Sequence, residues 1–183
     1  MRKLILIAFV LLMATNVMAK APMRSGVYVN SKAGIMYTNI KKDDEKVHDF
    51  VMPFSLALGV RLRYLRLEAE YTFSTKAKKD NYEQQTDTMM AQFYYDVPFK
   101  SPIRPFVNVG GGRYEAKIKV PGVSKESRSG WAYNVGGGMT WNVSNAVNLD
   151  IGYRYLMIDK LKTKMGTVKV QHHIAYIGWR YVF

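Results

Sequence analysis

A two-residue alternation of apolar and polar side chains runs through most of the chain and constrains its fold more than any other feature. Over residues 147–155 the odd-numbered side chains are apolar or aromatic, and the even-numbered ones are polar or glycine. Comparable alternation recurs over residues 54–62, 65–73 and 131–141. Because successive side chains of a strand point to opposite faces, this period predicts β-strands with one apolar and one polar face.

Residues that interrupt the alternation divide the chain into eight predicted strands and set the lengths of the connections. The expected strands are 26–39, 53–63, 65–76, 86–97, 103–115, 129–141, 146–158 and 168–183. Short connections fall at 63–64, 98–102 and 142–145, and longer, charged ones fall near 40–52, 77–85, 116–128 and 159–167. Short turns at one end and longer extracellular loops at the other are typical of a transmembrane barrel. The predicted fold is therefore an all-β, eight-stranded antiparallel up-and-down transmembrane β-barrel.

The N-terminus has the pattern of a secretory signal peptide. Arg2 and Lys3 precede an apolar run over residues 4–14, and small residues end at Ala19. A run of eleven apolar residues is too short for a transmembrane helix, which needs about 20. We therefore expect a cleaved signal peptide at 1–19 and an outer-membrane β-barrel domain at 20–183. The chain has no cysteine, which excludes a lipoprotein anchor, a disulfide scaffold and a thiolate metal site.

Alternation alone leaves a soluble β-sandwich or a soluble periplasmic lipocalin-like barrel open, because both bury one face of each strand. The polar face, however, carries opposed charges at mid-strand positions. Eight strands enclose an interior that side chains can fill, so these charges are expected to form a lumenal network rather than line an open diffusion channel. The members of this predicted network are Arg61, Arg66, Glu68, Glu70, Asp150, Arg154 and Arg180.

The C-terminus provides a second argument for a closed barrel. Trp179, Tyr181 and Phe183 alternate along the last predicted strand, which ends the chain. Such an apolar edge strand would promote aggregation in a soluble protein, whereas in a closed barrel it pairs with the first strand. Aromatic residues also gather near the ends of other strands, as expected for girdles at the two membrane interfaces.

Several stretches resemble the small Opa-like and OmpX-like "porin family" of outer-membrane β-barrel proteins. They are residues 61–71, 93–98, 105–112, 135–138, 149–155 and 178–183. The resemblance implies an integral outer-membrane barrel of a Gram-negative bacterium, with a structural role or a role as an adhesin or surface antigen. It also implies that Trp179, Tyr181 and Phe183 form the signal read by the barrel assembly machinery. The resemblance transfers no binding residue, since members of this family differ in their loops.

The sequence predicts no catalytic residue, no metal site and no cofactor. His172 and His173 are adjacent in a strand, so they face opposite sides and cannot share one metal ion. The glycine triplets at 110–112 and 136–138 lie within strands, and barrel curvature or close packing of lumenal side chains explains them better than phosphate binding. A lipid A-modifying outer-membrane enzyme is the alternative function, although no nucleophile and base can be nominated.

Lysines in the longer connections are the most suggestive functional feature. The formal net charge is +13, and it is +11 without Arg2 and Lys3. A basic rim attracts lipid A phosphates or acidic polysaccharides, and simple solvation beside the anionic outer leaflet is the other explanation. Expected partners are outer-membrane lipid and lipopolysaccharide, the assembly machinery and host-surface or polyanionic ligands, but not nucleic acid. The candidate polyanion-binding residues are Lys41, Lys42, Lys78, Lys79, Lys117, Lys119, Lys160, Lys162 and Lys164.

Overall fold

The computed structural model describes residues 25–42, 45–75, 77–79, 82–98, 101–119, 126–163 and 166–183. Side chains are described for 25–38, 50–75, 86–98, 101–116, 129–158 and 171–183. The predicted signal peptide lies outside these residues. Within the described part of the chain, no helix is long and apolar enough to cross a membrane.

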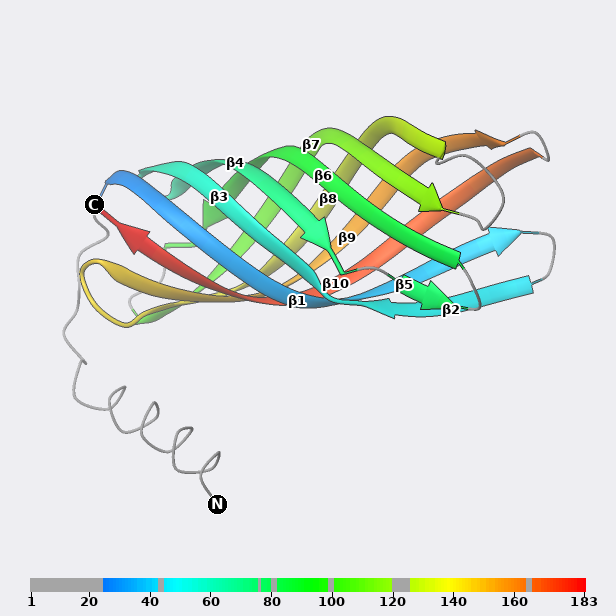
Figure 1. The fold of residues 1–183 in the computed structure, drawn as a ribbon. Helices are drawn as coiled ribbons and strands as arrows, with labels where there is room; N and C mark the ends of the chain where they lie inside the picture. Colours follow the sequence, from blue (N-terminus) through cyan, green and yellow to red (C-terminus); the bar gives the residue numbers. More distant parts are fainter. Residues whose placement is uncertain are drawn as a thin grey trace, which may run out of the picture.

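Ten antiparallel strands form one sheet that closes on itself (Figure 1). β2 and β3 both pair with β1 on either side of Met52, and β4 and β5 both pair with β6. The described strands therefore make eight barrel strands, which confirms the predicted architecture. Their bounds are β1 Gly26–Lys42, β2 Glu45–Val51, β3 Pro53–Leu62, β4 Leu65–Ser74, β5 Ala77–Lys79, β6 Tyr82–Asp96, β7 Ile103–Lys119, β8 Glu126–Asn142, β9 Val147–Thr163 and β10 Gly166–Val182.

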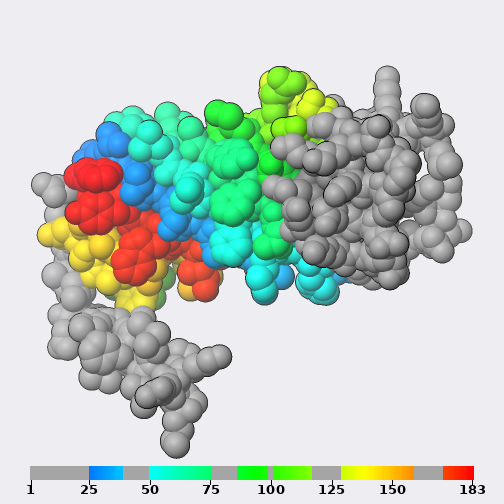
Figure 2. All heavy atoms as spheres, viewed as in Figure 1, coloured from blue at the N-terminus to red at the C-terminus, as the bar shows by residue number. Residues whose placement is uncertain are grey.

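The first and last strands close the barrel. β1 pairs with β10 from Tyr28↔Val182 to Lys41↔Lys169, and the blue residues of β1 lie beside the red residues of β10 in Figure 2. This pairing satisfies the backbone groups that an open sheet would leave exposed at its two edges. The C-terminal strand is thus paired as the sequence predicted.

The wall of the barrel is apolar outside and polar inside. Burial alternates residue by residue along β3, where Leu56 and Leu58 are 61% and 59% exposed and Ser55 and Ala57 are buried. β4 continues the pattern, with Glu68 and Glu70 buried and Leu67 exposed. A soluble protein places its apolar face inside, so this arrangement suits a barrel whose outer face contacts lipid.

The two ends of the barrel differ in their connections. At the end that holds the C-terminus (Figure 1), Arg63 and Tyr64 form a two-residue turn in which Arg63 has a left-handed φ of 54°. At the other end, most of the predicted loops continue as strands: β1 pairs with β2 out to Lys42↔Glu45, and β9 pairs with β10 out to Thr163↔Gly166. Predicting long loops at 40–52, 77–85, 116–128 and 159–167 was therefore wrong for most of these residues. Neighbouring charged residues in the sequence, such as Lys41 and Lys42, interrupt the alternation there, but backbone pairing continues.

Candidate functional site

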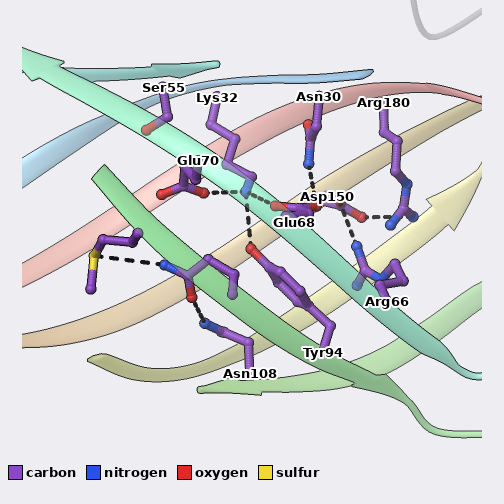
Figure 3. A network of polar contacts seen from close by, with 12 residues as sticks. Asn30, Lys32, Ser55, Arg66, Glu68, Glu70, Tyr94, Asn108, Asp150 and Arg180 are labelled. Carbon is purple, nitrogen blue, oxygen red and sulfur yellow. Dashed lines mark hydrogen bonds and ion pairs between the residues drawn. The ribbon is translucent and has the colours of Figure 1, made fainter. Parts of the chain in front are cut away.

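The middle of the lumen contains a charge cluster built around Lys32 (Figure 3). Its Nζ atom lies 2.5 Å from carboxylate oxygens of both Glu68 and Glu70, and it donates a hydrogen bond of 2.9 Å to the Tyr94 hydroxyl. Arg154 Nη1 lies 2.5 Å from the other oxygen of Glu70. All five side chains are buried, and they come from β1, β4, β6 and β9. The ion pair between Arg154 on β9 and Glu70 on β4 therefore joins strands on opposite sides of the barrel.

A second charge cluster lies nearer the end with the short turns. Arg66 Nη2 lies 2.7 Å from Asp96, and its Nη1 lies 3.3 Å from Asp150. Arg61 contacts the second oxygen of Asp96 at 2.9 Å. Arg180 Nη2 lies 3.2 Å from Asp150. Two aspartates thus hold three arginines from β3, β4 and β10.

Aromatic rings fill the space between and beside the two charge clusters. The Arg66 guanidinium lies 4.3 Å from the centroid of the Tyr94 ring and 5.1 Å from that of Phe106. Tyr28 packs against Gly59, and its hydroxyl donates a 2.9 Å hydrogen bond to Glu68. Close approach of a ring explains the glycine, since any Cβ at that position would collide with it.

The open space in the lumen is small. A cavity of about 30 Å³ adjoins the Lys32 cluster on the side away from the short turns, and His172 and Thr88 contribute to its lining. Such a volume accommodates about two water molecules and not a passing solute. The lumen is therefore filled with side chains and is not a wide pore.

All seven side chains predicted for the lumenal network are buried on the inner face. Two of their ion-pair partners lie outside the predicted set: Lys32 pairs with Glu68 and Glu70, and Asp96 pairs with Arg61 and Arg66. Sequence reasoning missed three partners, Lys32, Asp96 and Tyr94. Alternation could have indicated Lys32 and Asp96. Lys32 lies two residues from buried Asn30, and Asp96 lies four residues from buried Gln92, so each shares a strand face with a polar lumenal residue.

The basic residues predicted to bind polyanions gather at one end of the barrel, opposite the short turns. Strand pairing places them by backbone: Lys41 and Lys42 in β1, Lys78 and Lys79 in β5, Lys117 and Lys119 in β7, and Lys160 and Lys162 in β9. Lys164 lies outside the described residues. We use the term basic rim for these positions.

The aromatic residues of the last strand point outward. Trp179, Tyr181 and Phe183 are 53%, 44% and 66% exposed, and the rings of Tyr181 and Phe183 lie 5.2 Å apart. They occupy the end of the barrel with the short turns, at the margin of the lipid-facing surface. Such aromatic residues are typical of the membrane interface.

The two adjacent histidines lie on opposite faces of β10, as predicted. His172 is buried, and its Nδ1 is 2.8 Å from the Thr38 hydroxyl. His173 lies against the rings of Tyr37 and Tyr155 on the outer face, and its Nδ1 contacts the Tyr153 hydroxyl. Among the described residues, no group of three or more His, Asp or Glu side chains is arranged to hold a metal ion.

A closed antiparallel barrel with an apolar exterior and paired charges inside defines the class of integral β-barrel membrane proteins. The model of the outer membrane protein beta-barrel domain family matches residues 6–183. The chain belongs to this family and is an integral protein of the outer membrane, which confirms the predicted resemblance and location.

Solved structures of outer-membrane barrels support this assignment. Neisserial surface protein A is 26% identical, with a TM-score of 0.68 over 87% of this chain and 98% of that one. Ail, the attachment invasion locus protein of Yersinia pestis, was solved in complex with the heparin analogue sucrose octasulfate. It is 17% identical, with a TM-score of 0.53 over 85% of this chain and 99% of that one. OprG from Pseudomonas aeruginosa is 13% identical, with a TM-score of 0.53 over 90% of this chain and 100% of that one. Likeness to the last two concerns the fold alone. A search of curated protein sequences finds no match.

Proposed function

We propose that this protein is a non-enzymatic surface-interaction barrel that binds polyanions outside the cell through its basic rim. The observation that carries the proposal is an uneven distribution of charge among the extended hairpins. Residues 117–128 contain four basic and one acidic side chain, and residues 159–170 also contain four and one. Residues 41–49, by contrast, contain three basic and four acidic ones. The positive charge is therefore concentrated in the β7–β8 and β9–β10 hairpins.

These two hairpins are neighbours in the barrel. β8 pairs with β9 along Ala132↔Ile158 to Asn142↔Asn148, so the tips of both hairpins extend from adjacent parts of the wall. By the usual layout of outer-membrane barrels, the end with the short turns is periplasmic and the extended hairpins are extracellular. Neighbouring excess positive charge raises the local concentration of a polyanion. The complex of Ail with a heparin analogue supports the choice of a sulfated glycan as the ligand class.

The inner face supports a role without catalysis. Lumenal carboxylates that could act as acid or base are occupied by cations, as Glu70 is by Lys32 and Arg154. On the outer face, His173 contacts tyrosine rings. Mass spectrometry of lipid A from expressing cells tests this part of the proposal. We expect an unchanged lipid A profile, and a new acylation or deacylation product would overturn the non-enzymatic assignment.

Binding of the purified barrel to immobilised heparin, in non-ionic detergent, tests the polyanion proposal. The variant K117Q/K119Q/K160Q/K162Q removes four charges from the β7–β8 and β9–β10 hairpins. Since exposed ion pairs contribute about 0.2–1 kcal/mol each, the affinity for heparin should fall about fourfold or more. The matched variant K41Q/K42Q/K78Q/K79Q removes four charges from the other two hairpins and should bind nearly as well as the unaltered protein.

Two results would contradict the proposal: no heparin binding at moderate salt, or equal losses in the two variants. A parallel titration with lipid A vesicles separates an external glycan from the lipid of the membrane itself. If the barrel binds lipid A through Lys117, Lys119, Lys160 and Lys162 but does not bind heparin, the basic rim interacts with the outer leaflet instead.

We further propose that residues 1–19 are removed during export and that the C-terminal strand carries the assembly signal. The apolar run of the N-terminus supports the first part, and outward-facing Trp179, Tyr181 and Phe183 support the second. Intact-mass measurement should give a mature chain that begins at Lys20. Phe183→Ala should lower the amount of assembled barrel in outer membranes, and an unchanged amount would count against an assembly role.

A further inference from the structure

At the periplasmic end of the lumen, cationic side chains outnumber anionic ones. Arg61, Arg66 and Arg180 share the carboxylates of Asp96 and Asp150. Arg104, the second residue of β7, adds a fourth guanidinium, and it lies within electrostatic range of Arg61 together with Arg66 and Arg180. Four positive groups therefore face two negative ones, and we call this set the arginine cluster.

The two aspartates already have partners for both of their carboxylate oxygens. Asp150 receives hydrogen bonds from Arg66 at 3.3 Å, Arg180 at 3.2 Å and Thr140 at 2.6 Å. Asp96 receives one guanidinium on each oxygen, at 2.7 and 2.9 Å. Glu68, the next carboxylate along the lumen, accepts from Lys32, Tyr28 and Asn30. Glu68 lies within electrostatic range of Arg66, but among the described residues no carboxylate other than Asp96 and Asp150 accepts a hydrogen bond from these arginines.

Several guanidinium nitrogens in the cluster are buried and lack a hydrogen-bond partner. They are Nε and Nη1 of Arg180, Nε and Nη1 of Arg104, and Nε of Arg61 and Arg66. Arg180 has no exposed surface at all, whereas Arg104 is partly exposed at the mouth of the barrel. A buried charged donor without an acceptor is costly, because it has lost its hydration and gained nothing in return.

The pairing of Arg61 with Arg66 shows how the fold neutralises two such cations. These residues lie directly opposite each other on β3 and β4, where like charges are destabilising. Asp96 bridges them with its two oxygens. Asp150 likewise bridges Arg66 and Arg180 with one oxygen each. No carboxylate bridges Arg180 to Arg104, and the described residues give Arg104 no ion pair.

We propose that the arginine cluster binds a small inorganic anion, such as chloride or phosphate, at the periplasmic mouth of the lumen. The anion accepts hydrogen bonds from both Arg104 and Arg180. It bridges these two arginines as Asp96 bridges Arg61 and Arg66. Guanidinium groups suit this ligand, since their donors are fixed in a plane and match oxyanions well. Tyr94, Phe106 and Tyr176 form a buried cluster beside the arginines.

Thermal unfolding of the refolded barrel, read from its heat-dependent gel mobility, tests this site. Sodium phosphate or chloride is compared with sodium gluconate at equal ionic strength, because gluconate screens charge but is too large to enter. At ten times the dissociation constant, the bound ion should raise the midpoint by about 3–6 °C. In gluconate, the unfolding midpoint of Arg104→Gln should equal or exceed that of the unaltered protein. Phosphate and chloride should no longer raise the midpoint of this variant.

Arg63→Gln is the matched control. Arg63 lies at the same end of the barrel, but it is exposed in the turn and packs over the Tyr64 ring outside the lumen. This variant should keep the full response. Two results would overturn the proposal: gluconate raises the unfolding midpoint as much as phosphate or chloride does, or Arg104→Gln keeps the full response. Either result would show that the anions act only by general charge screening. If Arg104→Gln does not fold, bromide-containing crystals of the unaltered protein decide. An anomalous peak between Arg104 and Arg180 supports the site, and its absence refutes it.

Discussion

The inner and outer faces of the barrel wall share one alternating pattern but stabilise the protein in different ways. On the inner face, Lys32, Glu68 and Glu70 contact one another at specific distances, and glycine makes room for the ring of Tyr28. On the outer face, side chains such as Leu58 and Ile177 are exposed and require only an apolar surrounding. The inner face therefore depends on the identity of each residue, whereas the outer face depends on its polarity.

Removing the cation of Lys32 should produce the largest loss of stability and is the strongest test of the difference between the inner and outer faces. Lys32→Met leaves Glu68 without its ion pair and Glu70 with Arg154 alone. Removing one partner of a buried pair costs about 3–5 kcal/mol of unfolding free energy. Urea unfolding in lipid vesicles measures this loss. Lys41→Met, at the extracellular end of β1, is the control and should change stability by about 0.5 kcal/mol or less. Comparable effects of the two variants would contradict a specific inner face.

A charge placed on the outer face should produce the next largest effect. Leu58→Arg puts a cation in the middle of β3 on the lipid-facing side, where such a change costs about 2–4 kcal/mol. Leu58→Phe keeps the surface apolar and should be tolerated within about 0.5 kcal/mol. The same unfolding assay applies. If both variants were equally stable, the outer face would not be in contact with lipid.

Adding a single methyl group should produce the smallest of the three effects. A Cβ at Gly59 would lie 2.7 Å from the carbonyl oxygen of Leu67 and closer still to the ring of Tyr28, so Gly59→Ala should cost about 1–3 kcal/mol. At Gly111 the nearest atom, in the Tyr133 ring, is 3.6 Å away. Gly111→Ala should therefore be neutral within about 0.5 kcal/mol. Equal stability of the two variants would show that the lumen is less tightly packed than described.

The architecture was predictable because alternation is a local property of the sequence. It identified the eight barrel strands, the polar inner face and the closing C-terminal strand. Prediction failed where charged residues interrupt the alternation: over residues 40–52, for example, backbone pairing continues although the sequence shows no regular two-residue pattern. Hairpin pairing of this kind depends on the partner strand, which a local pattern does not report.

Individual contacts in the lumen were harder to predict than the inner face itself. Lys32 and Glu68 are 36 residues apart in the chain, and only the register of β1, β3 and β4 brings them together. Arg66 likewise reaches Asp150 across the interior from a strand that is not its neighbour. Such pairs depend on strand tilt and on the width of the lumen. Alternation therefore predicts which residues face inward, but not which of them meet.

Closure by β1 and β10 has a consequence for how the molecule is made. The contacts from Tyr28↔Val182 to Lys41↔Lys169 join the first and last strands of the barrel, so they have the greatest sequence separation of any strand pairing among the described residues. Contacts of this kind form late and slowly, because most of the chain must be ordered before its ends meet. Until β10 arrives, the nascent sheet has two unpaired edges and is open to aggregation. Closure of the sheet therefore depends on β10, and a chain truncated before Gly166 would lack the strand that pairs with β1.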